Sequence, residues 1–460
     1  MKVSVILAAG EGSRMKSKKP KVIHEILGEP MLGYVVKAAR ESDVSRVSVI
    51  VGHGKEEIVK RFENSELIFR TQPIGEDVPY GTGFAVMQAI EDFEDEDTVL
   101  ILNGDTPLVK ADTLNGLMEY HERGNFSCTI LTADMQNPFG YGRIVRNEDA
   151  QITRIVEEKD AGGKEKLIRE INSGIFVFNG RELKSSLKNL NTDNSQGELY
   201  LTDVVKDLFE SEKRIGGYKL KDNTEILGIN SRDSLCIANE IMQTRVNVEY
   251  MKKGVTMIDS KSIIIEPTVE IGCDTKIYPG AILQGNTVIG EDCTIYGNTR
   301  IIDSKIGNEV TIDNALIEES VVGDGTTIGP FAHLRPKSNV GKKVKIGNFV
   351  EVKNTNFGDG SKAGHLAYIG DADVAEDVNV GCGVVFVNYD GKNKFRSKID
   401  EGAFLGSNSN IVAPVHVEKN GYIAAGSTIT KDVGEDQLAI ERADRRDIEG
   451  WVTKKGLNRR

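Results

Sequence analysis

The chain has 460 residues, of which 39% are hydrophobic and 28% charged, and its formal net charge is -12. This length exceeds one ordinary core, so we expect a soluble protein with two or more domains. An acidic chain without a basic run is a poor nucleic-acid binder, and no stretch approaches the roughly 20 apolar residues that span a bilayer.

The first residues predict a buried strand that ends in a glycine-containing loop. Val3 to Gly10 is mostly apolar, and Glu11-Gly-Ser-Arg14 follows it. Apolar strands at 47–51 and 99–102 alternate with helical stretches such as 31–41. That order is typical of βαβ units in a mostly parallel sheet covered on both faces. Ligands of such sheets lie beyond the carboxyl ends of the strands, so we expect a site at the loops after Ala9 and Leu102.

Both loops carry residues suited to phosphate. The first lacks the third Gly of a dinucleotide fingerprint and the Lys-Ser/Thr of a P-loop. Its glycines still let backbone N–H groups converge, and Arg14 and Lys21 add positive charge; a plain strand-to-helix turn is the alternative. Asp105 follows the second strand and would be costly to bury without a partner. Mg²⁺ takes such carboxylates together with substrate phosphates, and a helix N-cap is the alternative.

A helix at 231–253 is predicted to join two domains, with Leu235, Ala238, Ile241 and Met242 on one face. We therefore expect a domain at 1–230, a helical linker at 231–251 and a second domain at 252–460.

The second half carries a six-residue repeat. Aliphatic residues recur at every sixth position, as in Ile271, Ile277 and Leu283. Neither a helix nor a simple strand has this period, whereas hexapeptide β-helices do, with one short strand and one turn per repeat. The phase slips at 352–369 and at 386–399. We interpret these two breaks as the places where chemistry resides, because candidate polar residues lie inside them.

Five cysteines are scattered without a C-x-x-C pair, which predicts a reducing, cytoplasmic compartment and no structural zinc.

Short motifs along the first half resemble those of the sugar-nucleotide pyrophosphorylases. They are Leu7-Ala-Ala-Gly-x-Gly-Ser-Arg-Met15, Pro20-Lys21, Gly81-Thr-Gly83, Gly104-Asp105, Gly140-Tyr-Gly-Arg143, Val156-Glu157, Glu170-Ile-Asn172-Ser-Gly174 and Gly228-Ile-Asn230. With the hexapeptide repeat added, nearly the whole chain resembles the bacterial bifunctional UDP-N-acetylglucosamine pyrophosphorylase and glucosamine-1-phosphate N-acetyltransferase family. The resemblance implies a Rossmann-like nucleotidyltransferase domain, a helical linker and a left-handed parallel β-helix.

For the first domain the resemblance implies uridylyl transfer from UTP to N-acetylglucosamine-1-phosphate, with release of pyrophosphate. It implies that Arg14 and Lys21 neutralise the triphosphate and that Asp105 and Asn230 hold Mg²⁺. The residues implied to bind UDP-N-acetylglucosamine are Leu7, Ala8, Ala9, Gly10, Lys21, Gln72, Gly81, Thr82, Gly142, Glu157, Asn172 and Asn230. Among them, Gln72, Gly81 and Thr82 would contact uracil.

For the β-helix the resemblance implies acetyl transfer from acetyl-CoA to glucosamine-1-phosphate. An amine attacks only when neutral, and an imidazole suits the role of base, so His365 is the candidate. Those implied to bind the sugar phosphate are Arg335, Lys353, Tyr368 and Asn379. Those implied to line the acetyl-CoA site are Cys382, Asn388, Tyr389, Ser407, Ala425 and Arg442. The resemblance also implies a homotrimer with this site at a subunit junction, and a role in supplying precursors for peptidoglycan.

The chain departs from the family pattern at four places. The loop 73–80 is longer than usual, Tyr80 and Phe84 stand where Leu and His are usual, Cys382 replaces Ala, and His333 replaces Arg. Two alternative functions are a single nucleotidyltransferase with a purely structural or regulatory β-helix, and a non-catalytic sugar-nucleotide sensor. The set Lys353, His365, Tyr368 and Asn388-Tyr389 argues against the first alternative. Asp105 and Asn230, together with the basic loop, argue against the second.

Overall fold

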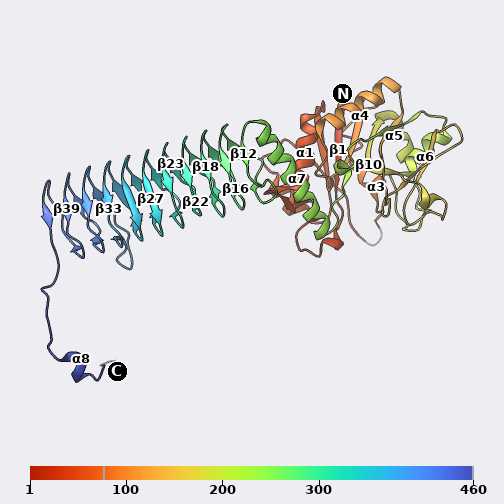
Figure 1. Cartoon of the computed structure of the whole chain (residues 1–460). Helices are drawn as coiled ribbons and strands as arrows, with labels where there is room; N and C mark the ends of the chain where they lie inside the picture. The colour runs from red at the N-terminus through yellow and green to blue at the C-terminus, as the bar shows by residue number, and fades with distance from the viewer. Residues whose placement is uncertain (76–77, 458–460) are drawn as a thin grey trace. The chain divides into compact units, whose positions relative to one another are not determined.

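The computed structural model describes residues 1–75 and 78–457, which divide into two compact units (Figure 1). The first unit is Met1–Met242 and the second is Gln243–Arg460. The division falls inside the long helix α7 (Arg232–Lys252), where the sequence predicts the linker. Across the described residues, none of the helices combines the length and apolar character that crossing a bilayer needs.

The first unit is built on a nine-stranded sheet with the order β11-β7-β10-β6-β1-β4-β5, to which β8 and β9 attach beside β10. Parallel pairing joins β1 to β4 and β6, β4 to β5, and β7 to β11, while β10 runs antiparallel to both of its neighbours. This confirms a mostly parallel sheet. The strands are β1 (Lys2–Ala8), β4 (Arg46–Val51), β5 (Ile68–Thr71), β6 (Thr98–Asn103), β7 (Cys128–Asp134), β8 (Arg143–Arg146), β9 (Ile152–Val156), β10 (Glu170–Asn179) and β11 (Ile215–Lys219).

Helices cover both faces of this sheet because its strands are apolar on both sides. Along β1, Val3 and Val5 pack into one buried cluster, and Ile6 and Ala8 pack into another. The first cluster is completed by α3 (Thr82–Met87), α5 (Gly180–Leu187) and α6 (Asp203–Glu210), and the second by α1 (Met31–Glu41), α2 (Lys55–Arg61) and α4 (Ala111–Gly124). The sheet is therefore rigid, and its loops are held at its edges.

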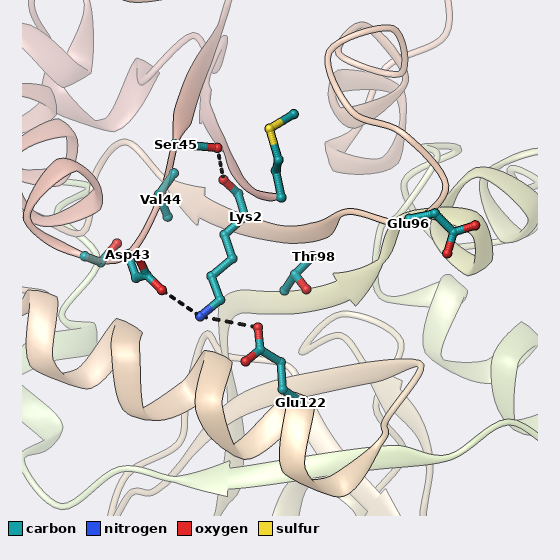
Figure 2. A pocket seen from close by; sticks show the side chains of 9 residues that line it. Lys2, Asp43, Val44, Ser45, Glu96, Thr98 and Glu122 are labelled. Atoms are coloured by element: carbon teal, nitrogen blue, oxygen red, sulfur yellow. Dashed lines mark hydrogen bonds and ion pairs between the residues drawn. The ribbon is translucent and has the colours of Figure 1, made fainter.

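The amino-terminal edge of the sheet carries charges that neutralise one another. Lys2 opens β1, and its Nζ lies 3.0 Å from Asp43 Oδ2 and 3.3 Å from Glu122 Oε1 (Figure 2). A cavity of about 450 Å³ lies beside these residues. The candidate residues of this first unit lie at the opposite edge, where the parallel strands β1 and β6 end.

The second unit is a β-helix of three parallel sheets with eleven, ten and nine strands. The first sheet runs from β12 (Thr256–Met257) to β41 (Leu438–Ala439), the second from β13 (Ile264–Ile265) to β40 (Thr428–Ile429), and the third from β14 (Glu270–Ile271) to β38 (His416–Val417). The chain visits the three sheets in turn, so Ile277, Leu283 and Ile289 belong to different sheets and all point into one core. The fold that the repeat predicts is confirmed, and Figure 1 shows its stacked coils.

The interpretation that phase breaks mark chemistry is wrong as a rule. The core positions Ile301 and Ile306 are five residues apart, as are Ile317 and Val322, and no candidate residue lies there. These coils shorten through tight corners at residues such as Asp303, whose φ is 46°. A slip in phase therefore reports a tighter corner, with or without a functional side chain.

Candidate active sites

Two adjoining cavities, of about 470 and 230 Å³, open at the carboxyl ends of β1 and β6. They share Leu7, Thr82, Asn103, Asp105 and Gly140 as lining residues. Every residue expected to bind UDP-N-acetylglucosamine lines one or both: Leu7, Ala8, Ala9, Gly10, Lys21, Gln72, Gly81, Thr82, Gly142, Glu157, Asn172 and Asn230. These residues come from segments up to 223 positions apart, from Leu7 to Asn230, and the sheet brings them together.

The loop after β1 folds close to Lys21. Gly12 has a φ of 67°, and a Cβ added there would lie 2.6 Å from the Cβ of Lys21, so only glycine permits this approach. Ser13–Met15 then form a single 3₁₀ turn, and the exposed Arg14 lines the larger cavity. The loop is thus neither a P-loop nor a plain turn into an α-helix.

The side-chain oxygens of Asp105 and Asn230 both face the ammonium group of Lys21. The Lys21 Nζ lies 2.5 Å from Asp105 Oδ2 and 3.1 Å from Asn230 Oδ1. The backbone N–H of Ile229 donates to the Asp105 carbonyl at 2.9 Å, which ties the two segments together. Asp105 caps no helix, since the next one, α4, begins at Ala111. The donor set of carboxylate and amide oxygens therefore fits a hard divalent cation such as Mg²⁺.

Gln72 supplies an unsatisfied donor to the larger cavity. The side chain is 3% exposed, and its Nε2 has no hydrogen-bond partner among the described residues. Leaving such a group unpaired costs about 1–3 kcal/mol, which a carbonyl of a bound base would relieve. Of the longer loop 73–80 beside it, residues 76 and 77 lie outside the described part of the chain. Tyr80 and Glu198 line the same cavity.

The smaller cavity is lined by a half-buried carboxylate, that of Glu157. Burial raises the pKa of Glu157, and its Oε1 accepts a hydrogen bond from the Thr202 hydroxyl at 3.1 Å. Thr202 and Glu198 were not among the sequence candidates. They lie beside the cavities because the segment 199–201 hydrogen-bonds to the loop 80–83, where Gly83 N donates to Leu199 O at 2.8 Å. No short sequence motif predicts such a contact between distant segments.

In the second unit, His365 ends β30 (Lys362–His365) and pairs with a residue that sequence reasoning missed. Its Nδ1 lies 2.7 Å from Asn348 Oδ1, on the preceding coil. An amide oxygen only accepts, so Nδ1 carries the proton and Nε2 keeps a free lone pair. His365 is exposed, so that nitrogen is accessible to a substrate amine.

Three of the six expected acetyl-CoA residues, Cys382, Ser407 and Ala425, continue the same corner of the β-helix. On successive coils it is occupied by Asn348, His365, Cys382, Ser407 and Ala425. Backbone hydrogen bonds stack these coils, with Asn408 N donating to Cys382 O at 2.7 Å and Gly426 N to Ser407 O at 2.8 Å. Coils of this kind are about 4.8 Å apart, so these five residues form a continuous column along the β-helix that includes His365.

Three of the four expected sugar-phosphate residues, Arg335, Lys353 and Tyr368, lie on or directly after strands of the neighbouring sheet. There β25 (His333–Leu334), β28 (Glu351–Lys353) and β31 (Tyr368–Gly370) pair in succession. A hydrogen bond with Lys394 lowers the pKa of Lys353. Two amines this close favour an anion between them, and Lys394 was not a sequence candidate. Arg335 Nη1 donates to Glu351 Oε1 at 2.8 Å.

Of the remaining candidates of the second site, the structure ties Asn388 and Asn379 to these sheets. Asn388 Nδ2 donates to Tyr368 Oη at 3.3 Å and to Asp371 Oδ2 at 2.5 Å, so it is tied to the sugar-phosphate side. Asn379 lies on β33 (Asn379–Val380), one coil after β30. Tyr389 and Arg442 are exposed. His333, which stands where the family pattern has Arg, pairs with Glu318, with 3.0 Å between His333 Nε2 and Glu318 Oε2.

The fold and these two sites define a sugar-phosphate nucleotidyltransferase joined to a hexapeptide-repeat acyltransferase. Residues 4–174 match the family model of the MobA-like NTP transferase domain, and residues 261–357 match the GMPPB C-terminal domain. The bifunctional protein GlmU of Clostridioides difficile (strain 630) is 51% identical over 452 residues, 98% of this chain and 97% of the relative. That of Alkaliphilus oremlandii (strain OhILAs) is 50% identical over 454 residues, 99% of this chain and 98% of the relative.

The chain therefore belongs to the family of the bifunctional protein GlmU. The bifunctional synthesis of UDP-N-acetylglucosamine from glucosamine-1-phosphate, acetyl-CoA and UTP is confirmed for it at this level of identity and coverage.

Proposed function

We propose that each of the two reactions is carried out within one of the two units, with the residues assigned above in the roles that the sequence implies. The observation that carries the first assignment is the convergence of all twelve expected residues on the two adjoining cavities. The observation that carries the second is the His365–Asn348 pair at the head of the corner column. The direct test is whether loss of Asp105 or of His365 stops one reaction and spares the other.

Uridylyl transfer needs no covalent intermediate, because the sugar phosphate attacks the α-phosphorus of UTP in line. The task of the protein is to hold the two reactants and to neutralise their charge. Arg14 and Lys21 face the triphosphate, Gln72 pairs with the base, and Glu157 holds the sugar. Asp105 and Asn230 would hold Mg²⁺, which supplies charge neutralisation on the phosphate oxygens when bound.

Acetyl transfer needs a neutral amine. The Nε2 of His365 takes a proton from the neutral amine of glucosamine-1-phosphate as the nitrogen attacks the thioester carbonyl. The C–S bond then breaks, and the sulfur of CoA receives that proton from His365 and leaves as the thiol. Lys353 and Arg335 bind the phosphate as charged donors. The corner from Cys382 to Ala425 positions the acetyl donor beside His365. A β-helix that only assembles or regulates a single enzyme would have no use for an oriented imidazole beside a paired-amine anion site.

Alkylation of Cys382 is expected to block acetyl transfer. The thiol is partly exposed and lies on the coil next to His365, so an N-ethylmaleimide adduct would fill the donor site. Cys236 and Cys273 are more exposed and will react as well. We expect Cys382→Ala to retain acetyl transfer in the presence of the reagent. Full activity of an enzyme whose Cys382 is shown by mass spectrometry to be alkylated would contradict the prediction.

We further propose that the chain forms a homotrimer through the corner that carries His365. Phe331, Phe349 and Leu366 stack there on successive coils and are 57%, 55% and 57% exposed. Their φ values are 59°, 56° and 45°, a left-handed conformation that favours Gly or Asn. Three exposed apolar side chains in strained positions are better explained by a partner subunit than by solvent.

Phe349→Asp is expected to reduce the assembly and to weaken acetyl transfer, because a charge in an apolar interface is costly to desolvate. Light scattering should give three chain masses for the unmodified protein and a smaller species for the variant. Val321→Asp serves as the control. Val321 is also an exposed apolar residue, but it lies on the third sheet, so its substitution should leave the assembly intact. A monomeric unmodified protein at working concentration would contradict the trimer.

We propose a cytoplasmic location, which the dependence on UTP and acetyl-CoA and the five free thiols support.

A further inference from the structure

Arg143 is a buried cation that the proposed mechanism does not use. It opens β8 and is 2% exposed, and it is absent from the described lining of both cavities. Its Nε has no hydrogen-bond partner among the described residues. A buried guanidinium is costly unless it is paired, so the contacts of its two terminal nitrogens account for its presence.

Those two nitrogens join segments from two strands. Arg143 Nη2 donates to Glu158 Oε2 at 2.7 Å, and Nη1 donates to the carbonyl of Tyr141. The same Glu158 oxygen accepts the backbone N–H of Gly140 at 3.2 Å. The pair therefore ties two peptide groups of the loop before β8 to Glu158, the second residue after the end of β9.

Both fixed segments line the smaller cavity. Gly140, Tyr141 and Gly142 form its wall on one side, and Glu157, which directly precedes Glu158, forms it on the other. The two walls touch: a Cβ added to Gly142 would lie 2.9 Å from Ile155 Cγ2 and 3.4 Å from Glu157 Oε2. A small shift of either segment would therefore change the distance between Gly142 and Glu157, the residues expected to hold the sugar.

We propose that Arg143 and Glu158 are a positioning pair that sets the width of the sugar-phosphate site without contacting the substrate. The inference rests on the proposed function, in which the smaller cavity holds the sugar. Glu157 faces the substrate, and its neighbour Glu158 fixes where the Glu157 backbone and the Gly140–Gly142 loop stand. Of the residues that the pair holds, Gly140 also belongs to the described lining of the larger cavity, whose other lining residues come from other segments. We therefore expect the pair to act mainly on the sugar site.

The test compares three substitutions in the full-length protein by steady-state kinetics of uridylyl transfer. Glu158→Gln keeps an acceptor for Gly140 N and removes the charge that holds Arg143. We expect it to raise the KM for N-acetylglucosamine-1-phosphate about ten- to a hundredfold, since small misplacements cost this much, and to leave the KM for UTP within about twofold. Acetyl transfer by the same polypeptide and the thermal unfolding of the first unit report whether the variant is folded.

Glu165→Gln is the matched control. Glu165 also pairs with an arginine, accepting from Arg154 Nη2 at 2.9 Å, and with a glycine amide, accepting from Gly162 N at 2.8 Å. It is absent from the described lining of both cavities, so its substitution should leave both KM values unchanged. Glu157→Gln is the reference for direct contact and should also raise the KM for the sugar phosphate.

The outcomes separate the inference from the function on which it rests. If Glu157→Gln has no effect on the KM for the sugar phosphate, the assignment of the cavity is wrong. If Glu157→Gln has its effect and a folded Glu158→Gln does not, the positioning role is wrong. It is equally wrong if Glu158→Gln raises both KM values in parallel or if Glu165→Gln matches it. Should Glu158→Gln fail to fold, Arg143→Lys keeps the buried charge, loses one of the two contacts and must show the same selective rise.

Discussion

Replacement of His365 by alanine is expected to lower the kcat of acetyl transfer by about 10²- to 10⁴-fold while leaving uridylyl transfer unchanged. The imidazole is held in one tautomer by Asn348 Oδ1 at 2.7 Å, so Nε2 is the nitrogen that accepts the proton of the amine. Alanine removes this base without disturbing the core, because the side chain is exposed at the end of β30. Substrate binding by Lys353 and Arg335 should persist, so the loss should fall on kcat.

Two further variants sharpen this prediction. Asn348→Ala should give a smaller loss than His365→Ala, because the base remains but its tautomer is no longer fixed. His416→Ala is the control. His416 lies on the third sheet of the same β-helix, with its Nε2 2.7 Å from Asp400 Oδ2, and it does not belong to the column of residues that contains His365. Acetyl transfer that survives in His365→Ala, or that falls equally in His416→Ala, would rule out His365 as the base.

The substitution Asp105→Ala is expected to lower uridylyl transfer by about 10²- to 10³-fold or more and to spare acetyl transfer. It removes the carboxylate that faces Lys21 Nζ together with Asn230 Oδ1, and with it the charged ligand proposed for Mg²⁺. Because uridylyl transfer depends on positioning and charge neutralisation, the loss of this charged group should slow the reaction directly.

The loss in Asp105→Ala should appear in metal binding as well as in rate. Titration with Mn²⁺ in the presence of UTP, followed by electron paramagnetic resonance, should show weaker binding than in the unmodified protein. Asp134→Ala is the control, because Asp134 ends β7 at the same edge of the sheet and pairs with Lys219, Nζ to Oδ2 2.6 Å, outside the described lining of the cavities. Unchanged Mn²⁺ binding in Asp105→Ala would place the metal elsewhere.

The sequence predicts most of the fold because its periods are local. The six-residue repeat places Ile277, Leu283 and Ile289 in the core, and the helix predicted at 31–41 is found as α1, Met31–Glu41. The first site is also readable from the sequence, since its residues stand in short motifs at strand ends. In a parallel sheet, the carboxyl ends of the strands lie together at one edge of the sheet.

What the sequence misses are contacts made between distant segments. Asn348 lies one coil before His365, and its role follows from the stacking of coils, which no short motif encodes. Thr202 reaches Glu157 only because the segment after residue 198 packs on the loop 80–83. Lys394 stands in a loop whose approach to Lys353 depends on the pairing of Tyr389 with Lys394. Phase breaks in the repeat gave no general guide, because corners tighten for conformational reasons too.

Mixing the two single-site variants tests most directly the claim that one chain carries two separate sites linked by a free intermediate. Folded Asp105→Ala supplied with glucosamine-1-phosphate, acetyl-CoA and UTP should stop at N-acetylglucosamine-1-phosphate, and folded His365→Ala should make almost no product. The mixture should form UDP-N-acetylglucosamine, because the intermediate released by one protein is used by the other. A mixture that stays inactive, or either variant losing both reactions while folded, would contradict the two-site account.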